Sequence, residues 1–158
     1  MTEIWAHRGA SGYAPENTLP AFELALEQGA DGVEFDVQLS RDGVVVVIHD
    51  ETLDRTTDGT GRVVDHSLDE LRELDASNGM PEYSPTSVPT LAEVLDLMEP
   101  HPVRINIELK NSEQPYPGLE EKVLAEVRER GLAERVVLSS FSDDSIGRLH
   151  RLAPDIEL

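Results

Sequence analysis

Two segments of the chain alternate between apolar and polar residues, and this period predicts β-strands with two unlike faces. Residues 33–39 place Val33, Phe35 and Val37 on one face, with polar residues between them. Residues 105–110 repeat the pattern, with Ile, Ile and Leu at the odd positions and Asn, Glu and Lys at the even ones. Successive side chains of a strand point to opposite faces. Each strand therefore has an apolar face for the core and a polar face that carries charge.

Other segments predict further strands with helices between them. Short apolar runs predict strands at 4–6, 44–48, 136–141 and 156–158. The spacing of apolar residues predicts helices at 18–29, 90–98, 119–130 and 142–153. Thr18 is suited to cap the first helix, and Thr90 with Glu93 forms a capping box for the second. Repeated alternation of strand and helix predicts a single α/β domain with a parallel sheet.

The connection between residues 39 and 44 predicts a hairpin rather than a crossover. It is about four residues long, whereas a parallel crossover needs a dozen or more. A two-residue Asp42-Gly43 turn would set Asp36 opposite His49. A four-residue loop would set Glu34 there instead. Either register would bring His49 back to the two carboxylates.

Residues 40–90, which include this hairpin, predict an excursion from the alternation of strands and helices. Residues 50–90 are rich in Thr, Asp, Gly, Ser and Pro, which favour turns and loops. Ser67 and Glu70 form a second capping box and predict one short helix inside the excursion.

Length, composition and charge favour a compact domain and narrow the range of partners. The chain has 158 residues, of which 39% are hydrophobic and 28% charged, values that suit one domain with a core. Its formal net charge of -19 argues against nucleic acid or an anionic membrane as a partner. An anionic substrate would need local positive charge, which a bound divalent cation could supply.

Cysteine content and hydropathy add expectations about location. The chain has no cysteine, which excludes disulfides and thiolate metal ligands. No apolar run approaches the roughly 20 residues of a membrane span, and the N-terminus shows no signal-peptide pattern. We therefore expect a cytoplasmic protein without stable membrane insertion. The oligomeric state stays open, a homo-oligomer included.

The polar faces of the two alternating strands carry the first candidate site residues, Glu34, Asp36, Glu108 and Lys110. A strand inside a parallel sheet is usually apolar on both faces, and buried charge is costly unless it is paired or binds metal. Carboxylates from separate strands form an all-oxygen set that suits Ca²⁺ or Mg²⁺ rather than zinc. The alternative is a structural ion pair of Lys110 with one of the carboxylates.

Two histidines and an arginine extend this candidate site. His7 and His49 each follow an apolar strand and precede a segment with turn composition. A pair of histidines at strand ends suggests a general acid and a general base. Arg8 is placed to hold an anionic oxygen with its forked donors, and the alternative for it is a surface salt bridge. Together these residues predict metal-assisted chemistry on an anion.

Ordered motifs of specific residues run through essentially the whole chain. They are His7-Arg8-Gly9, Pro15-Glu16-Asn17-Thr18, Val33-Glu34-Phe35-Asp36-Val37, His49-Asp50, Leu53-Asp54-Arg55-Thr56-Thr57, Thr90-Leu91 and Ile107-Glu108-Leu109-Lys110. Together these motifs resemble those of the glycerophosphodiester phosphodiesterase family. The resemblance implies a (β/α)8 TIM-type barrel. It also implies metal-dependent hydrolysis of glycerophosphodiesters, such as glycerophosphocholine or glycerophosphoethanolamine, to an alcohol and sn-glycerol 3-phosphate.

The resemblance further implies a role for each matching position. Carried over residue by residue, it makes Glu34, Asp36 and Glu108 the ligands of a divalent cation, Ca²⁺ or Mg²⁺. His7 and His49 become the general acid and base, in an order that the sequence leaves open. Arg8 and Lys110 become phosphate contacts. Glu16 also matches a motif, and its expected role is to orient a loop or the start of a helix.

The strand count departs from the implied barrel. Without the hairpin strand at 44–48, the chain supplies the first four of eight strands, and a fifth begins at Ile156. We therefore expect residues 1–158 to form a single domain that is truncated at its C-terminus, and the alternative is a half-barrel completed by a partner chain. The alternative functions are a lysophospholipase D-type phosphodiesterase of the same fold and a catalytically silent module that binds metal or phosphate.

Overall fold

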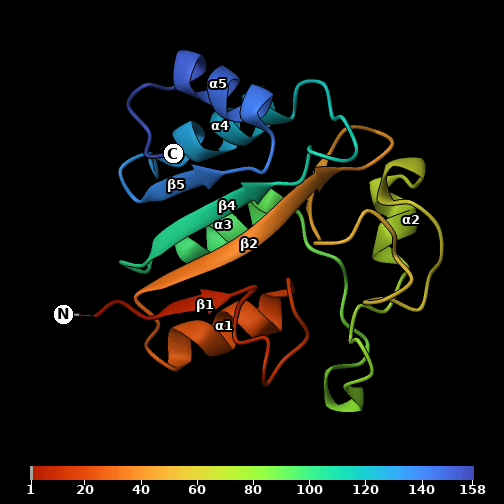
Figure 1. Ribbon diagram of the computed structural model, residues 1–158. Coiled ribbons are helices and arrows are strands. Elements are labelled where there is room, and N and C mark those ends of the chain that lie inside the picture. The colour runs from red at the N-terminus through yellow and green to blue at the C-terminus, as the bar shows by residue number, and fades with distance from the viewer. Residues whose placement is uncertain (1) are drawn as a thin grey trace.

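A computed structural model describes residues 2–158 and shows a sheet of parallel strands with one antiparallel strand added (Figure 1). The parallel strands lie in the order β1-β2-β4-β5, and β3 pairs with β2 in the opposite direction. The strands are β1 (Trp5–His7), β2 (Gly32–Leu39), β3 (Val45–Val47), β4 (Arg104–Leu109) and β5 (Val136–Ser139).

Helices lie in the crossovers between the parallel strands. The helices are α1 (Leu19–Glu27), α2 (Leu68–Arg72), α3 (Leu91–Met98), α4 (Leu119–Glu129) and α5 (Asp143–Leu152), and 3-10 turns lie at Val63–Asp65 and Pro81–Tyr83. Each crossover holds one α-helix, except the connection from β2 to β4, which holds both α2 and α3. The helix α1 connects β1 to β2, α3 precedes β4, and α4 precedes β5. This confirms the predicted α/β fold with a parallel sheet. Its strand and helix order is that of the N-terminal part of a (β/α)8 barrel.

The apolar face of the sheet packs against the helices, and the other face carries polar side chains. Phe35 of β2 and Ile107 of β4 are fully buried in one cluster with Phe22 of α1 and Val94 of α3. The rings of Phe22 and Phe35 meet edge to face, with centroids 5.4 Å apart. Because side chains alternate along a strand, the even-numbered residues of β2 and β4 point away from this core.

The hairpin between β2 and β3 has a register that differs from both predicted ones. Val37 pairs with Val47, and the amide of Ile48 donates to the carbonyl of Asp36 at 3.0 Å. His49 therefore lies opposite neither Asp36 nor Glu34, and both predictions were wrong.

The cause of the different register is the length of the loop. Ser40 N donates to Val44 O at 3.0 Å, which leaves a loop of three residues that ends at Gly43. Gly43 has a φ of +76°, the left-handed conformation that such three-residue hairpin loops use at their last position. An odd loop length shifts the pairing by one residue relative to either even length.

Helix and strand ends agree with the sequence in most places. The capping boxes at Ser67 and Thr90 are both formed. Thr18 occupies the N-cap of α1 but makes no cap hydrogen bond, because its hydroxyl donates to Pro15 O at 2.5 Å. β5 ends at Ser139 rather than at 141, since the next hydroxyl, Ser140 Oγ, accepts from Ser142 N at 3.0 Å and turns the chain into α5.

The C-terminal residues begin a further pairing, as the sequence predicts. Val137 and Glu157 form a parallel bridge, and the amide of Leu138 donates to the carbonyl of Glu157 at 2.9 Å.

The excursion carries a small core of its own. Val46, Ile48, Leu53, Val63 and Leu71 pack together with two further residues, so that α2 and the loops around it cover the hairpin. Asp75 organises its later part, since this carboxylate accepts from Ser84 Oγ at 2.6 Å and from Thr86 N at 3.0 Å. One α-helix lies inside the excursion, as predicted, together with the two 3-10 turns.

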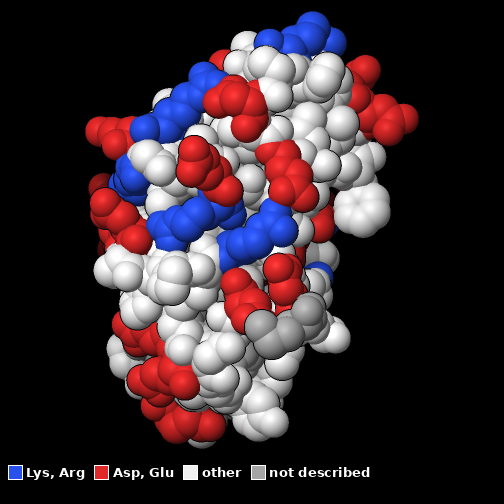
Figure 2. Space-filling view, turned by 90° about the vertical axis from the view of Figure 1, so that its left-hand side faces the viewer, with Lys and Arg blue, Asp and Glu red and all other residues white. Residues whose placement is uncertain are grey.

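Acidic and basic residues intermingle on the side of the molecule from which the N-terminus emerges (Figure 2). The strand arrows of Figure 1 point away from this side, so it lies at the amino ends of the parallel strands. Ion pairs in the structure include Arg128 with Asp155 at 2.9 Å and Arg130 with Asp96 at 2.6 Å. Within residues 2–158, no helix is both long enough and apolar enough to cross a membrane.

Candidate active site

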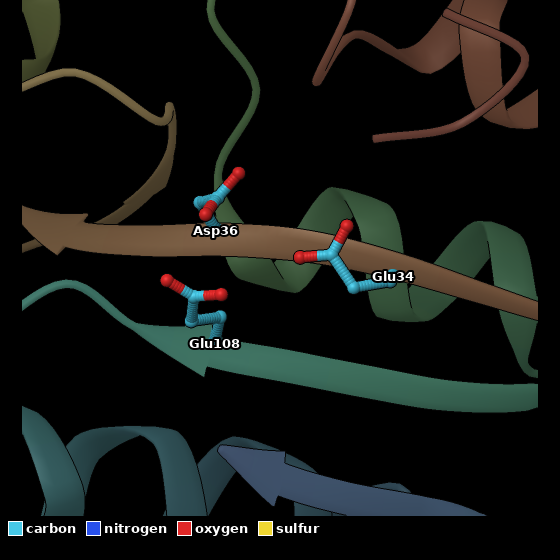
Figure 3. Close-up of side chains that lie close together, drawn as sticks. All are labelled: Glu34, Asp36 and Glu108. Carbon is cyan, nitrogen blue, oxygen red and sulfur yellow. The ribbon is translucent and has the colours of Figure 1, made fainter. Parts of the chain in front are cut away.

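Three carboxylates converge on the polar face of the sheet, where Glu34 and Asp36 project from β2 and Glu108 from β4 (Figure 3). One oxygen of each lies within 4.8 Å of the others. Positions 34 and 36 share a face because strand side chains alternate. The parallel register sets Glu108 directly beside Asp36. The alternation within each strand and the register between the strands together explain why these carboxylates meet.

The carboxylate cluster is largely shielded from water. The side chain of Asp36 is 1% exposed, and that of Glu34 is 12% exposed. Burial, assisted by the charges of Asp36 and Glu108, raises the pKa of Glu34 to about 7, although a hydrogen bond from the Arg8 amide opposes the rise. The pKa of Glu34 thus reflects the loss of surrounding water first and the neighbouring negative charges second.

Two side-chain cations contact the cluster without balancing it. Lys110 Nζ lies 3.3 Å from Glu108 Oε1, and Arg8 Nε lies 3.4 Å from Asp36 Oδ2. The structural ion pair considered for Lys110 is thus present. Among residues 2–158, Glu34 accepts a hydrogen bond from the Arg8 amide at 3.1 Å and has His7 Nε2 at 3.7 Å. Three carboxylates against two permanent cations leave negative charge, and the all-oxygen set can hold a divalent cation.

His49 contacts a carboxylate with one ring nitrogen and an ammonium with the other. Its Nδ1 lies 2.6 Å from Asp50 Oδ1, and its Nε2 lies 3.3 Å from Lys110 Nζ. An ammonium can only donate, so the acceptor here is Nε2 and the proton of a neutral ring lies on Nδ1. Through Lys110, His49 adjoins the carboxylate cluster, although the hairpin register differs from the predicted ones.

The backbone around His49 is held from beneath by one buried amide. Gln38 Nε2 lies within donating distance of the carbonyls of Ile48, His49 and Asp50, at 3.0, 3.0 and 2.7 Å. Tyr116 Oη donates to Gln38 Oε1 at 2.7 Å and thereby fixes the amide orientation. Burial raises the pKa of Tyr116 to about 12, so it remains a donor near neutral pH.

His7 lies at the carboxyl end of β1 and is the most open of the predicted site residues. Its side chain is 69% exposed, and its Nε2 is 3.7 Å from Glu34 Oε2. The pairing of His7 with Glu34 in the β1–β2 register brings the two residues together. The structure therefore places both histidines near the carboxylates, His7 beside Glu34 and His49 beside Lys110.

The loop after β1 uses unusual backbone conformations to present Arg8. Arg8 and Asn17 both have a φ of +58°, which is uncommon for residues other than glycine and often marks a functional site. Gly9 has a φ of +77°, and a Cβ there would lie 2.7 Å from the Ala21 carbonyl carbon. Asn17 N donates to Arg8 O at 3.0 Å and closes the loop.

Sequence reasoning assigned no site role to Asn17, Asp50 or Arg55, although all three stand in the family motifs. Asn17 Nδ2 donates to Asp36 Oδ2 at 2.9 Å and orients this buried carboxylate. Arg55 contacts both Asp50 and Glu16. Glu16 also accepts from Arg8 at 3.1 Å, in keeping with its expected orienting role. The motif positions were the available signal, but nothing local in the sequence indicates these partners.

Comparison with known proteins gives a consistent picture. Residues 7–158 match the model of the glycerophosphoryl diester phosphodiesterase family. The uncharacterized protein YqiK of Bacillus subtilis is 52% identical over 99% of this chain and 65% of its own length. A glycerophosphodiester phosphodiesterase of Bacillus altitudinis is 49% identical over 100% of this chain and 65% of its own length.

Solved structures share the fold as well as the sequence. A glycerophosphodiester phosphodiesterase from Agrobacterium tumefaciens has a TM-score of 0.90 and 43% identity, over 99% of this chain and 65% of that one. A phosphodiesterase of Oleispira antarctica, in complex with the product sn-glycerol-3-phosphate, has a TM-score of 0.84 and 39% identity. The match covers 99% of this chain and 64% of that one. The chain spans about 65% of the length of the curated relatives named above. It belongs to the glycerophosphoryl diester phosphodiesterase family.

Proposed function

We propose that this chain provides the active site of an enzyme that hydrolyses glycerophosphodiesters, such as glycerophosphocholine or glycerophosphoethanolamine, to an alcohol and sn-glycerol 3-phosphate. The observation that carries the proposal is the cluster of Glu34, Asp36 and Glu108, with its ligand oxygens within 4.8 Å and a histidine and a lysine beside it. Membership of the family and the product complex of the Oleispira antarctica relative support it.

In this proposal, Glu34, Asp36 and Glu108 hold a divalent cation, Ca²⁺ or Mg²⁺. The negative charge that Arg8 and Lys110 leave unbalanced is the electrostatic support for this role. When bound, such a cation would offset charge on the phosphoryl oxygens and polarise the phosphorus centre.

Arg8 and Lys110 bind the phosphate in the same proposal. Each already contacts a carboxylate of the cluster, so a phosphate bound by these residues would lie next to the cation ligands. The guanidinium offers two parallel donors and the ammonium a compact charge. Both would stabilise negative charge that develops as the phosphorus–oxygen bond breaks.

The histidines move the protons. With its proton on Nδ1, His49 has its accepting nitrogen, Nε2, facing Lys110, whose ammonium must turn to the phosphate before Nε2 can take another proton. This tautomer fits a general base that takes a proton from water or from a substrate hydroxyl. His7 would then donate a proton to the departing alcohol oxygen, and its open position leaves room for a head group.

A lysophospholipase D-type activity is the second candidate, and the apolar surface argues against it. An acyl chain would need a contiguous apolar patch near residues 50–90 or beyond. Among residues 2–158 the large exposed apolar side chains are Ile4, Tyr13, Phe141, Leu152 and Leu158. None lies within residues 50–90, and those beyond it are Phe141, Leu152 and Leu158. Tyr13 and Phe141 follow β1 and β5, which lie at opposite edges of the parallel sheet.

We further propose that residues 1–158 are the N-terminal part of one larger domain. The chain covers about 65% of the length of its relatives, which supports this. The outer position of β1 in the strand order and the pairing that Glu157 begins beside β5 support it as well. Further strands would pair with the sheet at both places and close the barrel. A half-barrel completed by a partner chain is the alternative, and the molecular mass of the active species distinguishes them.

The experiment that tests the function compares turnover with cation binding in single-site variants. We expect His49→Ala to abolish release of glycerol 3-phosphate from glycerophosphocholine while calorimetry shows unchanged binding of Ca²⁺ or Mg²⁺. A silent binding module predicts instead that the unaltered protein binds the cation without any release. Full activity of His49→Ala would remove this histidine from the mechanism.

A further inference from the structure

The guanidinium of Arg55 binds two carboxylates that belong to different loops. Its Nε donates to Asp50 Oδ2 at 2.7 Å and its Nη2 donates to Asp50 Oδ1 at 2.9 Å. Its Nη1 donates to Glu16 Oε2 at 2.8 Å, and Nη2 also donates to Glu16 Oε1 at 2.8 Å. One planar fork thus makes two bidentate pairs, a geometry that lysine cannot reproduce.

Each of the two carboxylates also binds a residue with a proposed role in the reaction. Asp50 Oδ1, which Arg55 Nη2 contacts, also lies 2.6 Å from His49 Nδ1. Glu16 Oε1, the other acceptor of Arg55 Nη2, receives Arg8 Nη1 at 3.1 Å. A continuous chain of hydrogen bonds therefore runs from the Arg8 guanidinium to the His49 imidazole, with Arg55 Nη2 at its centre.

The charges along this chain alternate and are only partly screened by solvent. The side chains of Glu16 and Asp50 are 14% and 26% exposed, and that of Arg55 is 44% exposed. The hydrogen bonds from Arg55 hold the pKa of the Glu16 and Asp50 carboxyls below their usual values. Both carboxylates therefore stay ionised near neutral pH.

The hydrogen bonds of Arg55 join two segments that are far apart in the sequence. Arg55 and Glu16 are separated by 39 positions. Glu16 lies in the loop after β1, whereas Asp50 and Arg55 follow β3 in the excursion. The phosphate contact and the proton-transfer group thus come from two loops that need a direct link to keep one geometry.

We propose that Arg55 is a positioning residue that couples Arg8 to His49. It keeps the guanidinium of Arg8, which binds phosphate, and the imidazole of His49 at a fixed distance and orientation to one bound substrate. This proposal rests on the proposed function, which supplies the roles of Arg8 and His49. Arg55 acts through Glu16 and Asp50 and has no role in contacting the reacting atoms.

Replacement of Arg55 gives the first test. We expect Arg55→Met to lower kcat by about 10- to 100-fold, the range typical of residues that orient functional groups. Cation affinity and the thermal unfolding midpoint should stay at their wild-type values. Arg55→Lys should recover only part of kcat, because an ammonium cannot make both bidentate pairs. The matched control is Arg72→Met, which removes an arginine of similar exposure that contacts Glu93 at 2.8 Å.

Kinetic outcomes decide between positioning and a merely structural role. A kcat of Arg55→Met within about twofold of the Arg72→Met control would overturn the proposal, since a twofold effect is only about 0.4 kcal/mol in barrier height. Loss of kcat in proportion to a lowered unfolding midpoint would overturn it as well. Lost kcat with unchanged stability and cation affinity supports it.

A second test needs no turnover and separates this proposal from the proposed function. In nuclear magnetic resonance spectra, Glu16→Gln should shift the ring resonances of His49, to which hydrogen bonds through Arg55 and Asp50 link Glu16. The same change made in the Arg55→Met background should leave the His49 resonances where Arg55→Met alone puts them. If Glu16→Gln leaves the ring unaffected while Arg55 is present, the coupling does not exist. If the coupling is present but no glycerol 3-phosphate is released, the coupling through Arg55 is supported and the proposed function is contradicted.

Discussion

At the scale of single residues, His49 is constrained from three directions. Asp50 accepts a hydrogen bond from the ring nitrogen Nδ1, and the Lys110 ammonium donates to Nε2. The side-chain amide of Gln38 donates to the backbone carbonyl of His49. The sequence led to the neighbourhood of this histidine but not to its partners. Its position after an apolar strand was visible, whereas its contact with Lys110 spans 61 positions. Such long-range contacts depend on the packed fold and leave no local pattern.

Replacement of Asp50 tests how much the tautomer of His49 matters. We expect Asp50→Asn to lower kcat by about 10- to 100-fold, because a side-chain amide accepts the Nδ1 proton less strongly and lets the ring adopt the other tautomer. Initial-rate kinetics at saturating glycerophosphocholine measure this directly. Cation affinity should not change. Unaltered kcat in a folded variant would show that the His49–Asp50 contact has no part in the reaction.

The loop that presents Arg8 makes a prediction about stability at one glycine. Gly9→Ala should destabilise the protein by at least about 1–2 kcal/mol, the usual cost of a side chain in a left-handed conformation. The close approach of its Cβ to Ala21 adds to this cost. Denaturant unfolding gives the difference. The control is Gly29→Ala, which has a similar φ of +77° but nothing within 4 Å of its Cβ, so that equal losses would contradict the role of the contact.

At the scale of elements, local sequence patterns predicted most of the helices and strands, whereas they did not predict the loop length of the β2–β3 hairpin. Both capping boxes formed because Ser67 and Thr90 interact with residues only three positions away. The alternation along β2 and β4 set each carboxylate on the polar face, and the β2–β4 register then brought the three together. The prediction of the hairpin register was wrong, because a change of one residue in loop length shifts every residue pair that follows.

Tyr116 supports the hairpin from a distant element and can be tested alone. Tyr116→Phe should destabilise the protein by about 1–3 kcal/mol, because it leaves the buried Gln38 oxygen without its donor. Urea unfolding followed by circular dichroism measures the change. Tyr13→Phe, at a side chain that is 71% exposed, is the control. Equal stability of the two variants would mean that water replaces the lost donor without cost.

The excursion contributes a prediction about pH at Asp75. Hydrogen bonds from Ser84 and Thr86 lower the pKa of Asp75 to about 2, below its value of about 3.9 in an unfolded chain. A lowered folded-state pKa means that the stabilisation is complete above the unfolded value and disappears as pH falls through about 2.

Stability measurements over a range of acid pH check this sign. At pH 6, the urea concentration at the midpoint of unfolding should be higher for the wild-type protein than for Asp75→Asn. This difference should shrink progressively between about pH 4 and pH 2. Glu82→Gln, an exposed change in the same segment, is the control and should show no such trend. A difference that is constant over this range, or that grows in acid, would contradict the role of the charge.

At the scale of the whole molecule, the net charge of -19 and the position of the site fit together. Acidic residues outnumber basic ones by 32 to 13, and at the amino ends of the strands the two kinds intermingle (Figure 2). On the polar face of the sheet, carboxylates instead gather without enough cations. A cation bound there would convert the most acidic part of the sheet into a place where a phosphodiester can bind.

The most direct test of this account is release of glycerol 3-phosphate from glycerophosphocholine in excess chelator, followed by addition of Ca²⁺ or Mg²⁺. It is made on this chain and on the protein extended to the length of its relatives. We expect release to stop with chelator and to return with the cation, and Asp36→Asn to show no return. Release that continues unchanged in chelator would contradict the cation site. Absence of release from the extended protein with both ions supplied would contradict the proposed substrate.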